Sequence, residues 1–315
     1  MLKRFMLLFL SVLLCLCACA CDGDGNNINS ADNRLTIVTT LFPQYDFAKA
    51  IVGDKADVHL LLTPGTDSHS FELTPSDISM IKSCDVFIYT GPNMEIWVNG
   101  ILDVISGDTR IVNLTESEGL VLKSAHEHHA DDEHGDYDPH IWTSPVNAMC
   151  MLLNIFDAVC AEDQDNAEYY RGNYLAYRDE LLSLDASLKS VADASAHNTL
   201  YFTGKFAFLY LVEEYGFDYV APFNSCSDLQ VEDLASVAKL VNEINEKNIS
   251  FVFYEEFSSS DILNTVINST GATPLLLHSA HNLSKDELDS GATYISIMNA
   301  NIENIRKALS DGKTN

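Results

Sequence analysis

Residues 165–194 read DNAEYYRGNYLAYRDELLSLDASLKSVADA, without proline and with one glycine, Gly172. Apolar and aromatic side chains recur every three or four residues, at Tyr174, Tyr177, Leu181, Leu184 and Leu188. This spacing predicts one amphipathic α-helix. A helix of about thirty residues is roughly 45 Å long, enough to run alongside two domains. We therefore expect this segment to link two halves of the protein.

Strands and helices alternate on both sides of this helix. Before it, a short β-branched segment at 35–40 opens a series of four strands separated by helical patterns. After it, a second series begins at 199–203 and ends in a terminal helix at 293–309. Such alternation predicts parallel βαβ units. The expected fold is α/β, with two similar lobes, each a four-stranded parallel-type sheet flanked by helices. The expected domains are an N-terminal lobe at 34–164, the linking helix at 165–194 and a C-terminal lobe at 195–315.

The N-terminus has the pattern of an export signal. Lys3 and Arg4 precede an apolar stretch that runs from Phe5 to about Cys17. A charged start followed by a short apolar core is typical of a secretory signal peptide and is too short for a comfortable membrane span. We expect residues 1–20 to be this signal, so that the protein acts outside the cytoplasm.

The signal ends in a pattern that resembles a bacterial lipobox. In Leu16-Cys17-Ala18-Cys19-Ala20-Cys21, the leucine three places before it favours Cys19 as the lipidated residue, with Cys21 as the alternative. Residues 21–33 are mostly Gly, Asn, Asp and Ser, a composition typical of a flexible tether. The prediction is a lipid anchor in the membrane, on a Gram-positive surface or facing a periplasm. An ordinary secretory signal with a cysteine-rich tail remains the alternative.

The formal net charge of −28 at pH 7 argues against a nucleic-acid partner, because neutralising phosphates requires an excess of Lys and Arg. An acidic surface keeps a protein soluble and attracts cations over a short range. The charge therefore favours a cationic ligand.

Histidines and carboxylates are concentrated in the loop from Ser124 to His140, which holds five histidines and six carboxylates. Imidazole and carboxylate are the ligands that hold zinc and neighbouring metals. A further histidine, His69, lies about seventy residues upstream in a separate loop. We interpret His140 as a fixed ligand that pairs with His69. The others form an accessory metal-collecting arm within the His-rich loop 124–137, or else a solvated polar insertion: His126, His128, His129 and His134.

The other candidate ligands follow predicted strands of the second half. Lys205 follows the strand at 199–203, and His278 and His281 follow the strand at 273–277. Glu255 and Glu256 come directly after the strand at 249–254. Open α/β sheets bind ligands beyond the carboxyl ends of their strands. If the two lobes face each other, all these loops meet in one interlobe cleft.

Several motifs together resemble one family. They are the lipobox, the segment Pro64 to Asp77, Gly91 with Glu95 and Trp97, Asp138-Pro139-His140-Ile141-Trp142, and the pattern Tyr-x-x-x-Met-x-x-Asn at 294–301. The chain resembles the solute-binding lipoproteins of zinc and manganese ABC importers, solute-binding protein family 9, cluster A-I. The resemblance implies two α/β lobes joined by one rigid helix and a single divalent metal between them. It also implies delivery of that metal to a membrane permease driven by a cytoplasmic ATPase.

The resemblance places His69 and His140 at the first two ligand positions of the family. The third position aligns with Lys205, a poor zinc ligand while its amine is protonated. The fourth aligns with His278. The predicted metal site is His69, His140, His278 and Glu256, with Glu255 or His281 as rivals for the last place. Lys205 then becomes an outer partner that orients a glutamate.

Three nitrogen ligands and one oxygen ligand favour Zn²⁺, whereas a set richer in carboxylates would favour Mn²⁺. The predicted function is capture of Zn²⁺, with Mn²⁺ as the alternative, by a monomeric, non-enzymatic protein of an ABC importer. Two other functions stay open, a surface adhesion lipoprotein stabilised by metal and a secreted zinc hydrolase. The hydrolase is disfavoured because the sequence has no helical His-Glu-x-x-His motif.

Overall fold

The computed structural model describes residues 34–66, 68, 71–105, 107–124, 137–223, 234–258 and 260–310. The expected signal, the tether, Cys19 and Cys21 lie outside the described residues, as do His69 and the four histidines of the accessory arm. From Leu35 onward, the described residues belong to one compact unit.

The first half is built on a four-stranded parallel sheet with the order β2-β1-β3-β4. The strands are β1 (Leu35–Thr39), β2 (Ala56–Leu60), β3 (Val86–Tyr89) and β4 (Arg110–Asn113). The helices are α2 (Phe42–Val52), α3 (Pro75–Ser83) and α4 (Pro145–Glu162). Every residue of β3 is buried, as expected for a central strand covered on both faces.

The second half repeats this arrangement. Its strands β5 (Thr199–Tyr201) and β6 (Asp218–Val220) pair in parallel, as do β7 (Phe251–Tyr254) and β8 (Thr273–Leu276). A parallel bridge between Phe202 and Phe253 joins the two pairs. The resulting order, β6-β5-β7-β8, matches that of the first half, so the α/β fold with two similar halves is confirmed. The helices are α6 (Leu209–Tyr215), α7 (Leu234–Lys247), α8 (Ser260–Thr270), α9 (Lys285–Asp289) and α10 (Tyr294–Ser310).

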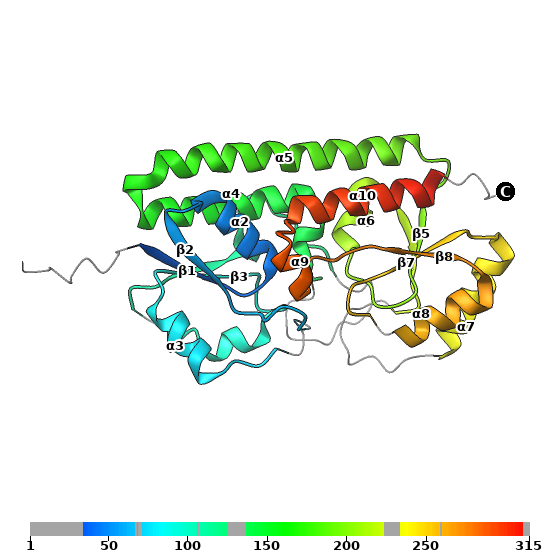
Figure 1. Cartoon of the computed structure of the whole chain (residues 1–315), viewed down its shortest axis with the longest axis horizontal. Coiled ribbons are helices and arrows are strands. Elements are labelled where there is room, and N and C mark those ends of the chain that lie inside the picture. Colours follow the sequence, from blue (N-terminus) through cyan, green and yellow to red (C-terminus); the bar gives the residue numbers. More distant parts are fainter. Residues whose placement is uncertain are drawn as a thin grey trace, which may run out of the picture. The chain divides into compact units, whose positions relative to one another are not determined.

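The long helix α5 (Ala167–Ala194) contacts α2 and α4 of the first half and α6 and α10 of the second, and it runs past both groups in Figure 1. Hydrogen bonds from its middle section fix it to both halves. The Tyr177 hydroxyl donates to Asp46 Oδ2 of α2 at 2.5 Å, and the Tyr215 hydroxyl of α6 donates to Asp185 Oδ1 at 3.0 Å. The helix is therefore anchored to both halves by buried side chains.

Three aromatic rings close the junction of α2, α5 and α10. The ring of Phe47 meets the rings of Tyr177 and Tyr294 edge to face, at centroid distances of 5.6 and 5.1 Å. Each such pair contributes about 0.5–1.5 kcal/mol beyond the burial of apolar area. This cluster holds the start of α10 against both the first half and the linking helix.

Among the described helices, α4 alone has the length and composition that would allow a membrane span, and half of it is buried within the fold.

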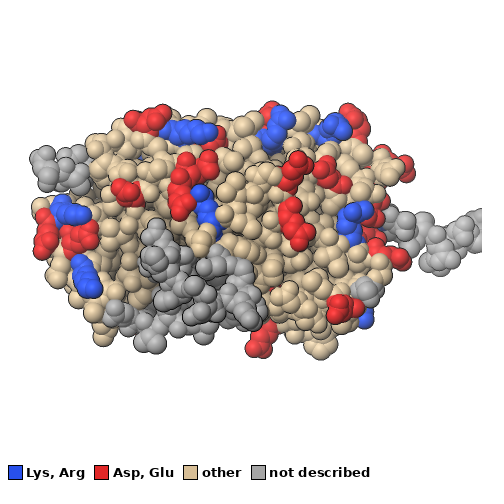
Figure 2. All heavy atoms as spheres, turned by 180° about the vertical axis from the view of Figure 1, so that it is seen from behind, with Lys and Arg blue, Asp and Glu red and all other residues tan. Residues whose placement is uncertain are grey.

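On the surface, Figure 2 shows acidic side chains spread over one face, with basic side chains interspersed singly among them. The described part of that face therefore offers no continuous basic surface of the kind that binds phosphate backbones.

Candidate metal centre

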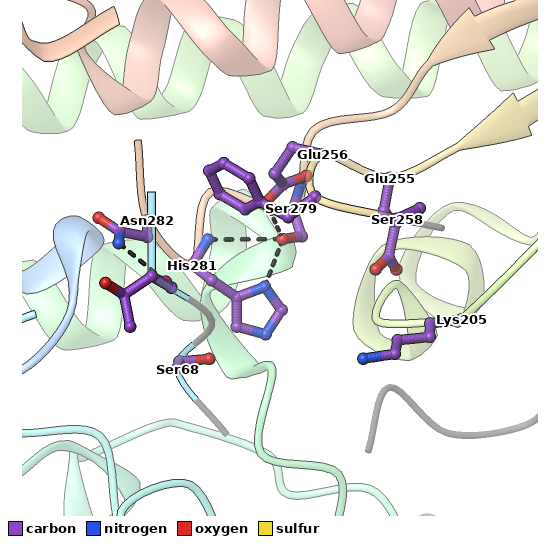
Figure 3. Close-up of a pocket in the computed structure, with 10 residues that line it drawn as sticks. Ser68, Lys205, Glu255, Glu256, Ser258, Ser279, His281 and Asn282 are labelled. Carbon is purple, nitrogen blue, oxygen red and sulfur yellow. Dashed lines mark hydrogen bonds between the residues drawn. The ribbon is translucent and has the colours of Figure 1, made fainter. Parts of the chain in front are cut away.

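A small pocket lies where the loops after β5, β7 and β8 meet the loop after β2, and its lining is drawn in Figure 3. It is lined by Thr66, Ser68, Lys205, Glu255, Glu256, Phe257, Ser258, Ser279, His281 and Asn282. The cavity volume is about 30 Å³. Sites for organic ligands usually measure about 300–1,000 Å³, whereas about 10–15 Å³ of such space is enough for one water molecule. The pocket therefore has the size for an ion.

His140 precedes the short 3-10 helix Ile141–Thr143 and is almost fully buried. Its Nδ1 lies 2.7 Å from Asp138 Oδ1, which also accepts the His140 backbone N–H at 2.8 Å. A carboxylate behind Nδ1 holds the ring in place, so a metal ligated by this histidine would bind Nε2. Asp138 is itself tied to the second half, because the Tyr210 hydroxyl of α6 donates to its carbonyl at 2.7 Å.

His281 follows β8 and lies beside His140. The two ring centroids are 4.7 Å apart, and the Trp142 ring lies 5.2 Å from His281. The turn before it passes through Ala280, a buried residue with a left-handed φ of 61°. The Ala280 N–H donates to His278 Nδ1 at 2.9 Å and so holds this turn. Trp142 adds a hydrogen bond from Nε1 to the Ser279 carbonyl at 2.7 Å.

His278 does not line the pocket. Its backbone N–H donates to Asn301 Oδ1, and its carbonyl accepts from Asn301 Nδ2, both at 2.8 Å. Its Nδ1 accepts the Ala280 N–H, and its Nε2 faces Glu287 Oε1 at 3.5 Å. Of the two histidines in this turn, the structure thus brings His281 to the pocket and turns His278 toward α9 and α10.

The two adjacent glutamates point in different directions (Figure 3). Burial and the neighbouring Glu256 raise the pKa of Glu255 to about 8, against the opposing effects of His140, the Ala207 N–H and Lys205. Glu255 Oε1 is buried and makes no hydrogen bond to any described residue. Burial also raises the pKa of Glu256, but both of its oxygens contact Ser279, with Oε2 accepting the Ser279 N–H at 2.7 Å. Glu255 is therefore the glutamate with an oxygen available to a cation.

Lys205 follows β5 and lines the same pocket, with its ammonium directed into the space near Glu255 and His281 in Figure 3. Its positive charge is one of the effects that lower the pKa of Glu255. A protonated lysine carries no lone pair, so a protonated Lys205 could act on a metal in this pocket through its charge but could not ligate it.

The loop that carries His69 borders the pocket through Thr66 and Ser68. Asn282, next to His281, holds this loop with hydrogen bonds from Nδ2 to the carbonyls of Thr63 (2.7 Å) and Thr66 (2.9 Å). Within the described residues alone, no three His, Cys, Asp or Glu side chains form a ready metal-binding group.

Sequence reasoning missed Asp138, Ser279 and Asn282 as site residues. Each lies within two residues of a candidate histidine, in the segments Asp138-Pro139-His140 and His278-Ser279-Ala280-His281-Asn282. A short polar side chain two residues before a histidine could have indicated an outer partner, because it can reach Nδ1 of that ring.

Known proteins that resemble this chain in sequence include zinc-uptake and zinc-binding proteins. A family model described as "Zinc-uptake complex component A periplasmic" matches residues 37–308. The high-affinity zinc uptake system protein ZnuA of Bacillus subtilis is 35% identical over 287 residues, covering 89% of each chain. The zinc-binding lipoprotein AdcA of Streptococcus pneumoniae is 32% identical over 308 residues, and the match covers 95% of this chain and 60% of AdcA.

The fold agrees with a solved structure of the same group. The Zn(II)-bound ZnuA-like domain of S. pneumoniae AdcA superposes with a TM-score of 0.75 at 28% identity. The match covers 88% of this chain and all of that domain.

Proposed function

Because the chain belongs to the family of periplasmic zinc-uptake complex component A proteins, we propose that it captures Zn²⁺ outside the cytoplasm for a zinc uptake system. The observation that carries this proposal is the ion-sized pocket that brings His281 and Glu255 together beside His140. A buried carboxylate oxygen without a hydrogen bond beside two imidazoles is the environment that a divalent cation stabilises.

We propose a ligand set that modifies the set drawn from the sequence. His140 and His281 supply Nε2 atoms, Glu255 supplies a carboxylate, and His69 completes the set from the loop that borders the pocket. Glu255 replaces Glu256, whose oxygens are held by Ser279, and His281 replaces His278, which faces Glu287. Three imidazoles and one carboxylate favour Zn²⁺ over Mn²⁺, which prefers a set richer in oxygen.

Lys205 is proposed to change the pH dependence of zinc binding at this site. Its ammonium stabilises the ionised form of Glu255, which is the form that binds metal, and it also repels the incoming cation. The two effects oppose each other. Lys205 is therefore expected to set the pH range of binding.

Delivery is proposed to follow the pattern of ABC importers, with a membrane permease and a cytoplasmic ATPase supplied by other chains. The proposal includes a lipid anchor at Cys19, or at Cys21, and a monomeric protein with lobes at 34–164 and 195–315 joined at 165–194. His126, His128, His129 and His134 are proposed to collect metal and pass it to the pocket.

The function is tested by zinc uptake. In the source bacterium grown under zinc limitation, deletion of the gene should reduce the uptake of radioactive zinc, and the wild-type gene should restore it. A gene carrying His140→Ala and His281→Ala should fail to restore uptake while giving the same amount of protein. Normal zinc uptake with reduced attachment to host surfaces would instead favour the adhesion alternative.

A further inference from the structure

We propose that Ser279 is a positioning residue that connects the Glu256 carboxylate to His281 and thereby fixes which nitrogen of His281 binds metal. The inference rests on the proposed function, because it assumes that His281 is a ligand of a metal in the pocket. It gives Glu256 a role distinct from that of Glu255.

Glu256, Ser279 and His281 form one series of hydrogen bonds, which runs from the loop after β7 to the loop after β8. Glu256 Oε1 contacts Ser279 Oγ, and Glu256 Oε2 accepts the Ser279 backbone N–H at 2.7 Å. Ser279 Oγ in turn contacts His281 Nδ1. All three residues have little exposure, 8% for the Glu256 side chain, 2% for Ser279 and 9% for His281. Water therefore does not compete effectively for these contacts.

The donors and acceptors balance in one direction. An imidazole that binds metal through Nε2 is neutral and carries its proton on Nδ1. The Nδ1–H of His281 then donates to Ser279 Oγ, and the Ser279 hydroxyl donates to Glu256 Oε1. In the reverse direction, Ser279 donates to Nδ1, no hydrogen is left between Ser279 and an ionised Glu256, and the proton moves to Nε2. Because the single hydroxyl hydrogen of Ser279 goes to Glu256, its oxygen can only accept from Nδ1–H, and this selects the metal-binding tautomer of His281.

The backbone keeps this series in place. The Ser279 carbonyl accepts from Trp142 Nε1 at 2.7 Å, so the residue is held from the first half as well. The left-handed Ala280, held by His278 Nδ1, turns the chain so that Ser279 and His281 point to the same side. His278 thus has a structural role in the series.

His140 provides an internal parallel. Its Nδ1 contacts the carboxylate of Asp138 directly, at 2.7 Å. His281 has the same kind of support, with one hydroxyl group inserted between ring and carboxylate. Outer partners of this type typically change metal affinity by about 10- to 100-fold when removed.

The test compares zinc affinity, measured by competition with a chelating dye, in the mature wild-type chain and four variants. Ser279→Ala is expected to weaken binding about 10- to 100-fold, and Glu256→Gln about tenfold. The double variant should be no weaker than Ser279→Ala, because Glu256 acts through Ser279. Ser117→Ala is the matched control, since Ser117 is also a buried hydroxyl with two partners but lies away from the pocket.

A second readout is independent of variant folding. In wild-type protein labelled with ¹⁵N-histidine, the side-chain nitrogen shifts of His281 should report Nδ1–H both with and without zinc. An Nε2–H tautomer, or equal zinc affinity of the Ser279→Ala and Ser117→Ala variants, would overturn the proposal. Failure of the wild-type chain to bind zinc would instead overturn the proposed function, so the two failures are distinguishable.

Discussion

The imidazole rings of His140 and His281 lie 4.7 Å apart, centroid to centroid, and nearly perpendicular at 80°. One belongs to the first half of the chain and the other to the second, 141 positions further on. A hydrogen bond from Trp142 Nε1 to the Ser279 carbonyl fixes the two loops to each other, and one from the Tyr210 hydroxyl ties Asp138 to α6. The pairing of the two rings is therefore built into the fold.

The first prediction separates the two histidines of the turn after β8. His281→Ala should abolish tight zinc binding, with a loss larger than the roughly 10- to 100-fold typical of outer partners. His278→Ala should retain zinc binding within about that range, because it removes the hydrogen bond that holds Ala280 and the ring's contacts with Glu256 and Glu287 but no proposed ligand. Calorimetric titration with zinc measures the affinity of each variant. The reverse order of effects would show that His278 is the ligand.

The second prediction concerns pH and Glu255. Its pKa of about 8 means that zinc binding at pH 7 must displace one proton from this carboxyl. Affinity should therefore rise about fivefold from pH 7 to 8, by about another twofold from pH 8 to 9, and level off above that. Calorimetry in buffers of different ionisation enthalpy should give about one more proton released at pH 7 than at pH 9. In Glu255→Gln, zinc affinity should no longer rise with pH over this range. If it still rises, the proton released on zinc binding comes from another group.

The same pKa also affects the metal-free protein. The folded form holds a proton on Glu255 that the unfolded chain, with an ordinary glutamate pKa near 4.5, has already released. This contribution to stability is fully present below pH 4.5 and is lost as pH rises through about 8. Glu255→Gln should reduce the fall in unfolding free energy over that interval, as measured by urea titration. A fall as steep as that of the wild type would contradict the assignment.

The third prediction tests Lys205. Lys205→Met removes the positive charge at similar length, so the pKa of Glu255 should rise and the pH midpoint of zinc binding should move upward. Above that midpoint, zinc should bind more tightly than in the wild type because the repulsion between two cations is gone. Lys205→Arg, which keeps the charge, is the control. An unchanged midpoint in Lys205→Met would exclude an electrostatic role.

The fourth prediction concerns the linking helix. Tyr177→Phe removes the donor to Asp46, whose pKa burial already raises, and should destabilise the protein by about 1–2 kcal/mol. Zinc affinity should stay the same, because Asp46 lies outside the pocket. Tyr169→Phe on the same helix, with 41% of Tyr169 exposed, is the control and should have little effect on urea unfolding. Equal effects of the two changes would contradict this anchoring role.

The sequence was sufficient for the fold because the signals were local. Alternating strands and helices, and the unbroken period of the segment that became α5, determine an α/β protein of two similar halves without knowledge of tertiary contacts. His140 could be singled out for the same reason, since its flanking motif is contiguous.

The choice between neighbouring residues depended on distant contacts. His278 and His281 are three positions apart, and which one enters the pocket follows from the left-handed Ala280 and from Asn301, 23 residues away. The choice between Glu255 and Glu256 follows from Ser279, also 23 residues away. No local pattern encodes these contacts.

A crystal structure of the zinc-loaded protein, with an anomalous signal at the zinc edge, tests the central claim most directly. We predict zinc bound by His140 Nε2, His281 Nε2, the Glu255 carboxylate and His69, with Glu256 still hydrogen-bonded to Ser279. Zinc coordinated by His278, Glu256 or Lys205 would contradict this account.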